Sequence, residues 1–408
     1  MTDYLTHILP NGLRIIYQQT ASAVSYAGFT VNAGTRDERA GEEGLAHFVE
    51  HLLFKGTQRR KSWHILNRME NVGGEINAYT AKEETVVYSV FLNEHLGRAV
   101  ELMSDLICHS QFPENEIAKE VEVILDEINS YKDSPAEAIY DEFENLLFPA
   151  HALGHNILGE KDTLLTFSSA DGRRFLQQHY TPSRVVFFFR GNVPFHRVIS
   201  AVARYMGDVD GAAGVPLCRE APAASVSFCR RVELDTHQAH ALVGGRACDM
   251  FDKRRPALFL LNNLLGGPGM NSRLNVALRE RKGYVYTVES TVTNYTDTGV
   301  FAIYFGTDPA KVDACLSLLH KELRHLRQEA LSSFQLANAK RQFIGQLAIG
   351  TENSESMALG MGKAFLHYGR YDSLAETMAR IEAVTAADIL AVANEFFDES
   401  ALSTLVYV

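Results

Sequence analysis

Three ionisable side chains lie within five positions of one apolar stretch near the N-terminus. His47, Glu50 and His51 follow the spacing H-x-x-E-H in the sequence EGLAHFVEHLLFKGT. Residues 45–54 lack Gly and Pro and are mostly apolar, which predicts a buried helix. Positions i and i+4 share a helix face, so the two imidazoles form a ready pair of zinc ligands. Glu50 stands beside them and suits a general base that takes a proton from water.

The alternative is a pair of buried structural histidines with a chance acid nearby. Three ionisable groups in so short an apolar helix are costly to bury without a metal or polar partners. A tetrahedral catalytic zinc site also needs a third protein ligand and one open position. The best candidates are Glu120 and Glu127, two helical turns apart in KEVEVILDEINSY. Taken alone, that segment would be a solvated acidic helix face.

The order H-x-x-E-H, the reverse of H-E-x-x-H, resembles that of the inverzincins, the zinc metallopeptidases that include pitrilysin, insulin-degrading enzyme and mitochondrial processing peptidase. The resemblance extends from LPNGLRII at 9–16 into the C-terminal half and suggests a short, two-domain bacterial-type member. Glu127 lies 76 residues after His51, the separation at which a glutamate completes the zinc site in that family. Glu120 matches a second family glutamate that supports the site without binding the metal.

The elements that must position these groups follow from residue patterns. Strands are predicted at 25–32, 75–79 and 85–92, and helices at 62–71 and 94–109. The resemblance implies an α+β fold of the LuxS/MPP-like metallohydrolase type. It has two homologous domains, each a mostly antiparallel sheet with helices packed on one face.

An internal repeat supports two homologous domains. The segment ALFLLNNLLGG in the second half repeats the pattern of AHFVEHLLFKG at an offset of 211. The three motif positions then fall opposite Leu258, Leu261 and Asn262. Only the first copy carries ligands, so we expect one Zn²⁺ per chain.

The domain boundary is predicted in a Gly-, Ala- and Pro-rich stretch at 207–224. We expect an N-terminal zinc-binding catalytic domain at 1–212. A homologous C-terminal domain without metal, at 213–408, would bind substrate and complete the site.

A second stretch, GPGMNSRLNVALRERKGYVYTV at 267–288, resembles a family segment that carries an Arg and a Tyr seven residues apart. Arg279 and Tyr286 have that spacing. The resemblance implies that they bind substrate and stabilise the transition state, because a cation and a phenol can donate hydrogen bonds to an oxyanion. The pattern is weak without the resemblance, and Arg281 and Tyr284 are rival assignments.

The resemblance also implies how substrates are bound. Asn77, Ala78 and Tyr79 match the family's edge strand, to which an extended peptide adds as a further strand. The expected function is a zinc-dependent endopeptidase that hydrolyses peptides or unstructured segments inside an enclosed chamber. Two-domain chains would need a homodimer to close that chamber, or a heterodimer with an inactive relative. A non-catalytic structural subunit or a peptide-binding scaffold is the alternative function.

Composition narrows the remaining classes. The net charge is −11 and no basic patch stands out, which argues against nucleic acid as a partner. Five scattered cysteines without C-x-x-C suggest neither a disulfide scaffold nor a cysteine zinc site. No signal peptide or membrane-spanning run is visible, so a cytoplasmic location without membrane contact is the default expectation.

Overall fold

The computed structural model describes residues 4–211, 217–224, 226–234 and 237–408. These residues form two compact units, neither of which is continuous in sequence. The first consists of Met1–Asn129, His155–Arg219 and Thr351–Ser373, and the second of Ser130–Gly154, Glu220–Gly350 and Leu374–Val408. Each half of the chain therefore contributes one segment to the unit that the other half mainly builds. The boundary predicted between residues 212 and 213 lies outside the described residues.

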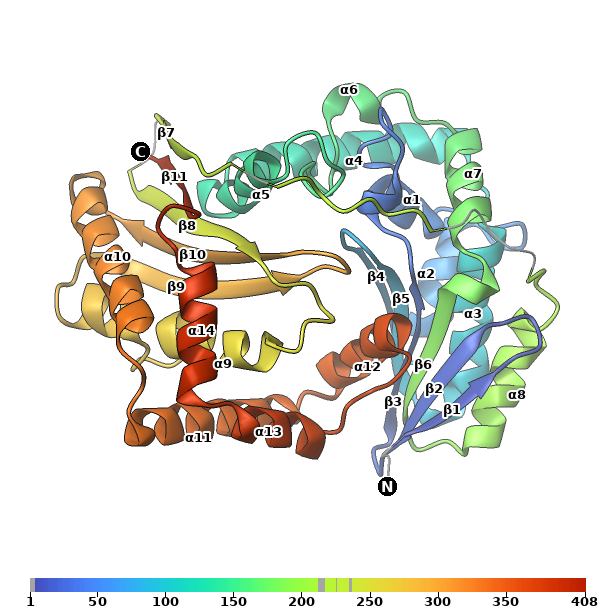
Figure 1. Cartoon of the computed structure of the whole chain (residues 1–408). Helices are drawn as coiled ribbons and strands as arrows, with labels where there is room; N and C mark the ends of the chain where they lie inside the picture. The colour runs from blue at the N-terminus through green and yellow to red at the C-terminus, as the bar shows by residue number, and fades with distance from the viewer. Residues whose placement is uncertain (1–3, 212–216, 225, 235–236) are drawn as a thin grey trace. The chain divides into compact units, whose positions relative to one another are not determined.

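The first unit contains a six-stranded sheet in the order β1-β2-β6-β3-β5-β4 (Figure 1). Only the β2–β6 pair is parallel, so the predicted mostly antiparallel sheet is confirmed. The central strands are rich in Val and Phe, which pack well on a pleated surface. The strands are β1 Leu5–Ile8, β2 Arg14–Gln19, β3 Val24–Val31, β4 Glu75–Thr80, β5 Thr85–Leu92 and β6 Val185–Gly191.

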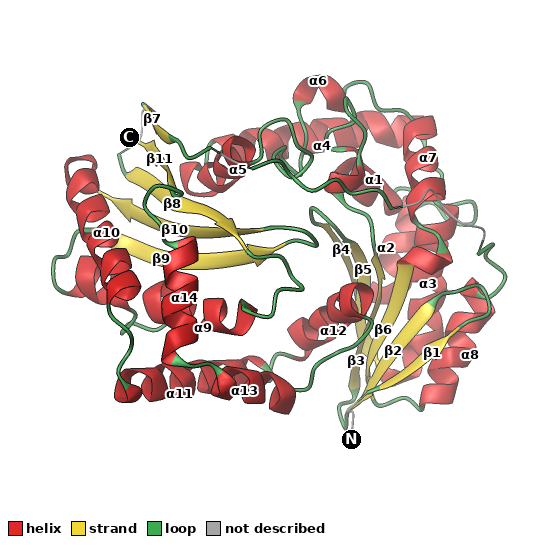
Figure 2. Ribbon diagram, viewed as in Figure 1, coloured by secondary structure: helices red, strands yellow, loops and turns green. Residues whose placement is uncertain are grey.

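Helices cover both faces of this sheet. Figure 2 shows α3 and α8 on one side of it and α12 on the other. The helices of this unit are α1 Leu45–Leu53, α2 Ser62–Glu70, α3 Leu96–His109, α4 Glu114–Lys132, α6 Lys161–Leu164, α7 Ser169–His179, α8 Phe195–Met206 and α12 Ser354–Tyr368. The apolar side of α12, including Met361 and Phe365, packs on Val186 and Phe188 of the central strand β6. A helix from the C-terminal half therefore completes the N-terminal core.

The second unit contains a five-stranded sheet in the order β7-β11-β8-β10-β9. Again one pair, β7–β11, is parallel and the others are antiparallel. The strands are β7 Cys229–Val232, β8 Ala239–Ala247, β9 Val285–Asn294, β10 Gly299–Thr307 and β11 Ser403–Tyr407. The helices are α5 Pro135–Leu147, α9 Arg255–Gly266, α10 Val312–Gln328, α11 Ser333–Gly350, α13 Leu374–Ala383 and α14 Ala386–Phe396, with a π-helical turn at Asn275–Glu280.

Two separate apolar clusters lie on the faces of this sheet. The larger joins Val243 and Phe301 to α9, α10 and α14. The other joins Leu242 and Leu405 to Ile139 and Phe143 of α5, a helix from the N-terminal half. The predicted helix layer on one face is therefore present in both units, and a single exchanged helix covers the opposite face.

The two sheets repeat one topology. The order β2-β6-β3-β5-β4 corresponds strand for strand to β7-β11-β8-β10-β9, with the same sense of pairing at every step. The offset of 211 places β4 opposite β9, and each is an edge strand. The internal duplication inferred from the sequence is thus present in the fold. Within the described residues, no helix combines the length and apolarity needed to cross a bilayer.

Candidate metal centre

The helix α1, which carries the motif, begins where the backbone at Gly44 lies close to the backbone at Gly159. Gly44 has φ +96°, and a Cβ there would come within 2.8 Å of Gly159. The carboxylate of Glu38 accepts hydrogen bonds from the backbone N–H groups of Gly44 at 3.0 Å and Ala46 at 2.7 Å. These donors would otherwise be unsatisfied at the helix start. Glu38 therefore fixes the first turn of the helix that presents the histidines.

Three potential ligands converge in the first unit. One ligand atom from each of His47, His51 and Glu127 lies within 4.8 Å of the other two. The Oε2 atom of Glu127 is 3.8 Å from Nε2 of His47 and 3.5 Å from Nε2 of His51. Ligands bound about 2 Å from one tetrahedral ion have similar separations. The described residues contain one such group, and it can hold one metal ion.

The protonation of His47 suits a ligand. Burial, assisted by the neighbouring His51, lowers the pKa of His47 to about 3. An imidazole must be neutral to bind a metal, so this ligand needs no deprotonation at neutral pH. Its Nδ1 is buried without a hydrogen-bond partner among the described residues, whereas its Nε2 faces Glu127.

Glu120, the predicted supporting glutamate, contacts the second histidine. Its Oε2 lies 3.1 Å from Nδ1 of His51, and its Oε1 pairs with Nζ of Lys55 at 2.5 Å. A carboxylate on one ring nitrogen fixes the tautomer and leaves the other nitrogen free for a metal. Lys55 was not predicted, and it neutralises a carboxylate whose side chain is only 8% exposed.

Glu50 lies on α1 between the histidines and the edge strand β4. Its Oε2 accepts a hydrogen bond from Oγ1 of Thr80 at 2.7 Å. Burial raises the pKa of Glu50 and the charge of Glu127 acts in the same direction, although Thr80 and His51 oppose the shift. A carboxylate with a raised pKa is a better proton acceptor near neutral pH. The arrangement agrees with the predicted general base without testing it.

The predicted substrate-binding residues lie on the same edge strand. Asn77, Ala78 and Tyr79 pair with β5 on one side, and β4 ends the order of strands in the described sheet. The other edge of β4 is therefore the one to which an added strand could pair. Thr80 joins this strand directly to Glu50.

Arg279 and Tyr286 lie in the second unit, at the π-helical turn and on β9. The side chain of Tyr286 is 67% exposed. Its rival Tyr284 packs against the core of the unit, with Nζ of Lys311 5.3 Å from the centre of its ring. Arg279 and Arg281 are both exposed. Exposure favours Tyr286 over Tyr284 as a residue free to meet a ligand, and the roles of both predicted residues stay predictions.

Comparisons with known proteins agree with this geometry. Residues 14–161 match the family model described as insulinase, peptidase family M16, and residues 166–343 match the peptidase M16 inactive domain. The chain belongs to peptidase family M16. It is 35% identical over 394 residues to an uncharacterized zinc protease of Streptomyces coelicolor, covering 95% of this chain and 86% of the relative. It is 32% identical over 397 residues to the uncharacterized zinc protease YmxG of Bacillus subtilis, covering 97% and 96%.

Solved structures show the same M16 fold. A protease from Helicobacter pylori superposes with a TM-score of 0.91 at 22% identity, covering 100% of this chain and 99% of that chain. A peptidase M16 inactive domain from Pseudomonas fluorescens gives 0.92 at 18%, covering 99% and 97%. The resemblance inferred from the motif is thereby confirmed for the family and the fold.

Proposed function

We propose that this M16 chain is a zinc-dependent endopeptidase that hydrolyses peptides or unstructured polypeptide segments. The observation that carries the proposal is the convergence of His47, His51 and Glu127 next to Glu50. A scaffold or a non-catalytic subunit would not need an acid beside three ligands. The names of the relatives, zinc proteases, support zinc as the metal.

When bound, a zinc ion would supply Lewis acidity that makes water a better nucleophile and a peptide carbonyl more electrophilic. Glu50, held by Thr80, takes the proton from the attacking water and returns it to the leaving amine. Glu120 keeps His51 oriented throughout. Arg279 and Tyr286 would donate hydrogen bonds to the negatively charged oxygen of the tetrahedral intermediate.

The proposed substrate is an extended chain. A peptide that adds along β4 would pair with the backbone of Asn77–Tyr79. It would then lie close to the carboxylate of Glu50. A folded protein cannot present an extended segment to a strand edge without unfolding locally. We therefore propose unstructured substrates and an enclosed site, formed by a homodimer or by a heterodimer with an inactive relative.

The experiment is cleavage of a quenched peptide library by metal-loaded protein. Chelation should abolish cleavage, and stoichiometric zinc should restore it. An unstructured peptide should be cut and a stable folded protein of the same sequence composition left intact. Zinc binding without any cleavage across the library would favour the scaffold instead.

Assembly is tested by mixing variants. A Glu50→Gln chain and a Tyr286→Phe chain, each impaired alone, should regain activity together if two chains share each site. No recovery, with exchange of subunits verified by labelled chains, would count against sharing and leave the metal chemistry untouched.

A further inference from the structure

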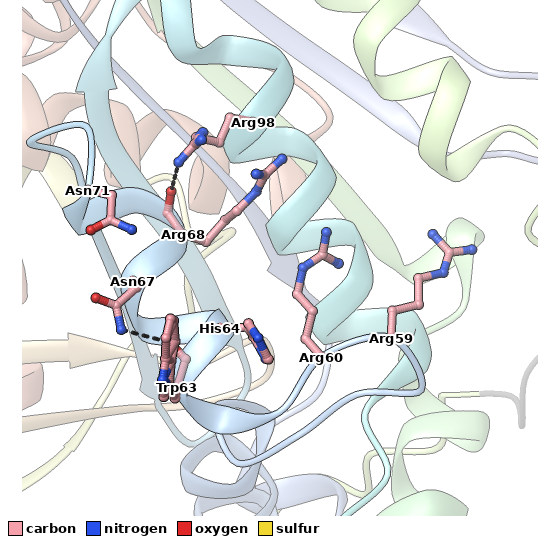
Figure 3. A pocket seen from close by; sticks show the side chains of 8 residues that line it. All are labelled: Arg59, Arg60, Trp63, His64, Asn67, Arg68, Asn71 and Arg98. Carbon is pink, nitrogen blue, oxygen red and sulfur yellow. Dashed lines mark hydrogen bonds between the residues drawn. The ribbon is translucent and has the colours of Figure 1, made fainter.

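A concave site lies on the first unit, and none of its lining residues belongs to the metal centre. It has a volume of about 300 Å³ and is lined by α2, the loop before it and the start of α3 (Figure 3). The lining consists of four arginines, one tryptophan, one histidine and two asparagines. No acidic and no aliphatic residue contributes, which is unusual on a chain with a net charge of −11.

Two of the four guanidinium groups are held in place by α3. Arg60 pairs with Glu101 and, at 2.5 Å, with Asp105. Arg68 makes two hydrogen bonds to the same Glu101, at 2.8 and 3.2 Å. Planar guanidinium groups fixed in this way keep further N–H donors available with little entropy left to lose.

The other two arginines have no carboxylate partner within the described residues. Arg98 donates only to the backbone carbonyl of Arg68, at 2.6 Å, and Arg59 makes no ion pair. Four positive charges therefore face two carboxylates, and an excess of two charges remains.

An aromatic platform lies at one end of the site. Trp63 is the only tryptophan in the chain, and it is 62% exposed on the first turn of α2. Asn67 and Asn71 follow it at intervals of four, on the same helix face. Figure 3 shows Trp63 at one end of this row and Asn71, beside Arg98, at the other. Eight residues of helix span roughly 12 Å.

We propose that this pocket binds a nucleoside phosphate. Its base would stack on Trp63, and its phosphate would lie among the guanidinium groups near Arg68 and Arg98. Stacking on an exposed indole and charge-assisted bonds from arginines are the interactions that such a ligand offers. The pocket volume lies at the lower end of small-molecule sites, which suits a mononucleotide rather than a polymer. The carboxamide of Asn71 adds donors and an acceptor at the end beside Arg98.

The sequence did not suggest this site. Its arginines are spread from Arg59 to Arg98, so no basic run appears. The absence of a basic run in the sequence does not prevent four arginines from gathering on the folded surface. Packing of α2 against α3 brings the charges together.

Because Trp63 is the sole tryptophan, its fluorescence reports on this pocket alone. Titration of the full chain with AMP, GMP, CMP and UMP should change the fluorescence saturably for at least one of them. The matching nucleoside and inorganic phosphate should each bind at least tenfold more weakly. The absence of a saturable change with all four nucleotides would overturn the proposal. So would equal binding of the nucleoside or of inorganic phosphate alone.

Variants test the two ends separately. Arg98→Gln should weaken nucleotide binding about tenfold or more, whereas Arg197→Gln, an exposed arginine of α8 outside the pocket, should not. Trp63→Ala, followed by calorimetry, should lose at least fivefold, and Trp63→Phe should lose less. Far-ultraviolet circular dichroism verifies folding of each variant. Unchanged affinity in both Arg98→Gln and Trp63→Ala would refute the assignment.

Discussion

The helices α1 and α9 occupy corresponding places in the two units, yet of the two only α1 carries potential metal ligands. Opposite His47 and Glu50 stand Leu258 and Leu261, both completely buried. Each helix is tied to its edge strand by a polar contact: Glu50 to Thr80 on β4, and Asn262 to Ser290 on β9 through two 3.0 Å hydrogen bonds.

The difference between α1 and α9 separates what the fold requires from what the site requires. An apolar helix pinned to an edge strand is common to both units, so it belongs to the architecture. Ionisable groups are costly to bury, and of these two helices only α1 carries them at the corresponding positions, where three ligands can share a metal. The duplicated unit without ligands shows that leucines fill the same positions well.

The largest expected effect comes from making α1 more like α9. His51→Asn introduces the residue that α9 carries at that position and removes one of three ligands. Bound metal, measured by elemental analysis, should fall from about one per chain to near zero, and peptidase activity should vanish with it. Retention of stoichiometric metal would contradict the ligand assignment.

The reverse change should not create a second site. Leu258→His places a polar ring where a leucine is completely buried. It should lower the free energy of unfolding by about 2–5 kcal/mol, measured by urea denaturation, without raising the metal content. Metal content above one per chain would show that other ligands lie near position 258 of α9.

Glu50→Gln keeps the ligands and removes the proton acceptor. The amide still fits beside Thr80, so metal content should remain at the wild-type level while kcat falls by a factor of about 10²–10⁴. Glu122→Gln, an exposed acid on α4, is the matched control and should change neither quantity. A variant that cleaves peptide at the wild-type rate would remove Glu50 from the mechanism.

A smaller effect on metal binding is expected for Glu120, which contacts the ligand His51. Glu120→Gln weakens the bond that orients His51 and leaves Lys55 without its partner. Metal affinity, measured by competition with a chelator, should fall by a factor of about 10–100. If affinity were unchanged, Glu120 would serve only the packing of α4.

Local patterns in the sequence predicted the elements of the first unit and the pair of histidine ligands. Helix α1 is bounded by Gly44 and ends near Phe54 as its apolar run requires, and β5 coincides with the predicted strand at 85–92. Glu127 was chosen from the separation seen in the family, because several helices and strands lie between it and His51 and their pattern alone does not predict that the two side chains meet. Residue patterns were therefore sufficient to predict helices and strands whose structure depends on neighbouring residues in the sequence.

Contacts between distant segments could not be predicted in this way. Lys55 contacts Glu120 and Thr80 contacts Glu50, and neither contact follows from the spacing of the motif residues. The exchange of α5 and α12 between the units is equally invisible to periodicity, because an amphipathic helix shows that it has an apolar face and not which sheet receives it.

These exchanged helices differ in how they are anchored, and pH should reveal the difference. On α12, Lys363 and His367 contact Glu84, which lies at the start of β5 and is almost completely buried. On α5, the hydroxyl of Tyr140 donates a hydrogen bond of 2.8 Å to Glu289, and the ion pair of 3.3 Å between Glu142 and Arg230 is partly exposed. Burial alone would raise the pKa of Glu84, but His367 and Lys363 outweigh it and lower that pKa to about 2.

A carboxylate whose pKa is lower in the folded state stabilises the fold while it is ionised. The contribution of Glu84 should therefore be complete above about pH 4.5 and should be lost as the pH falls toward 2. At pH 6, Glu84→Gln should lower the free energy of unfolding by on the order of 2 kcal/mol, measured by urea denaturation, because Lys363 and His367 lose their anion. The difference from the wild type should shrink steadily between pH 4.5 and 3, whereas Glu70→Gln, an exposed acid of α2, should show no difference at any pH. A constant difference across that range would mean that Glu84 acts through packing and not through its charge.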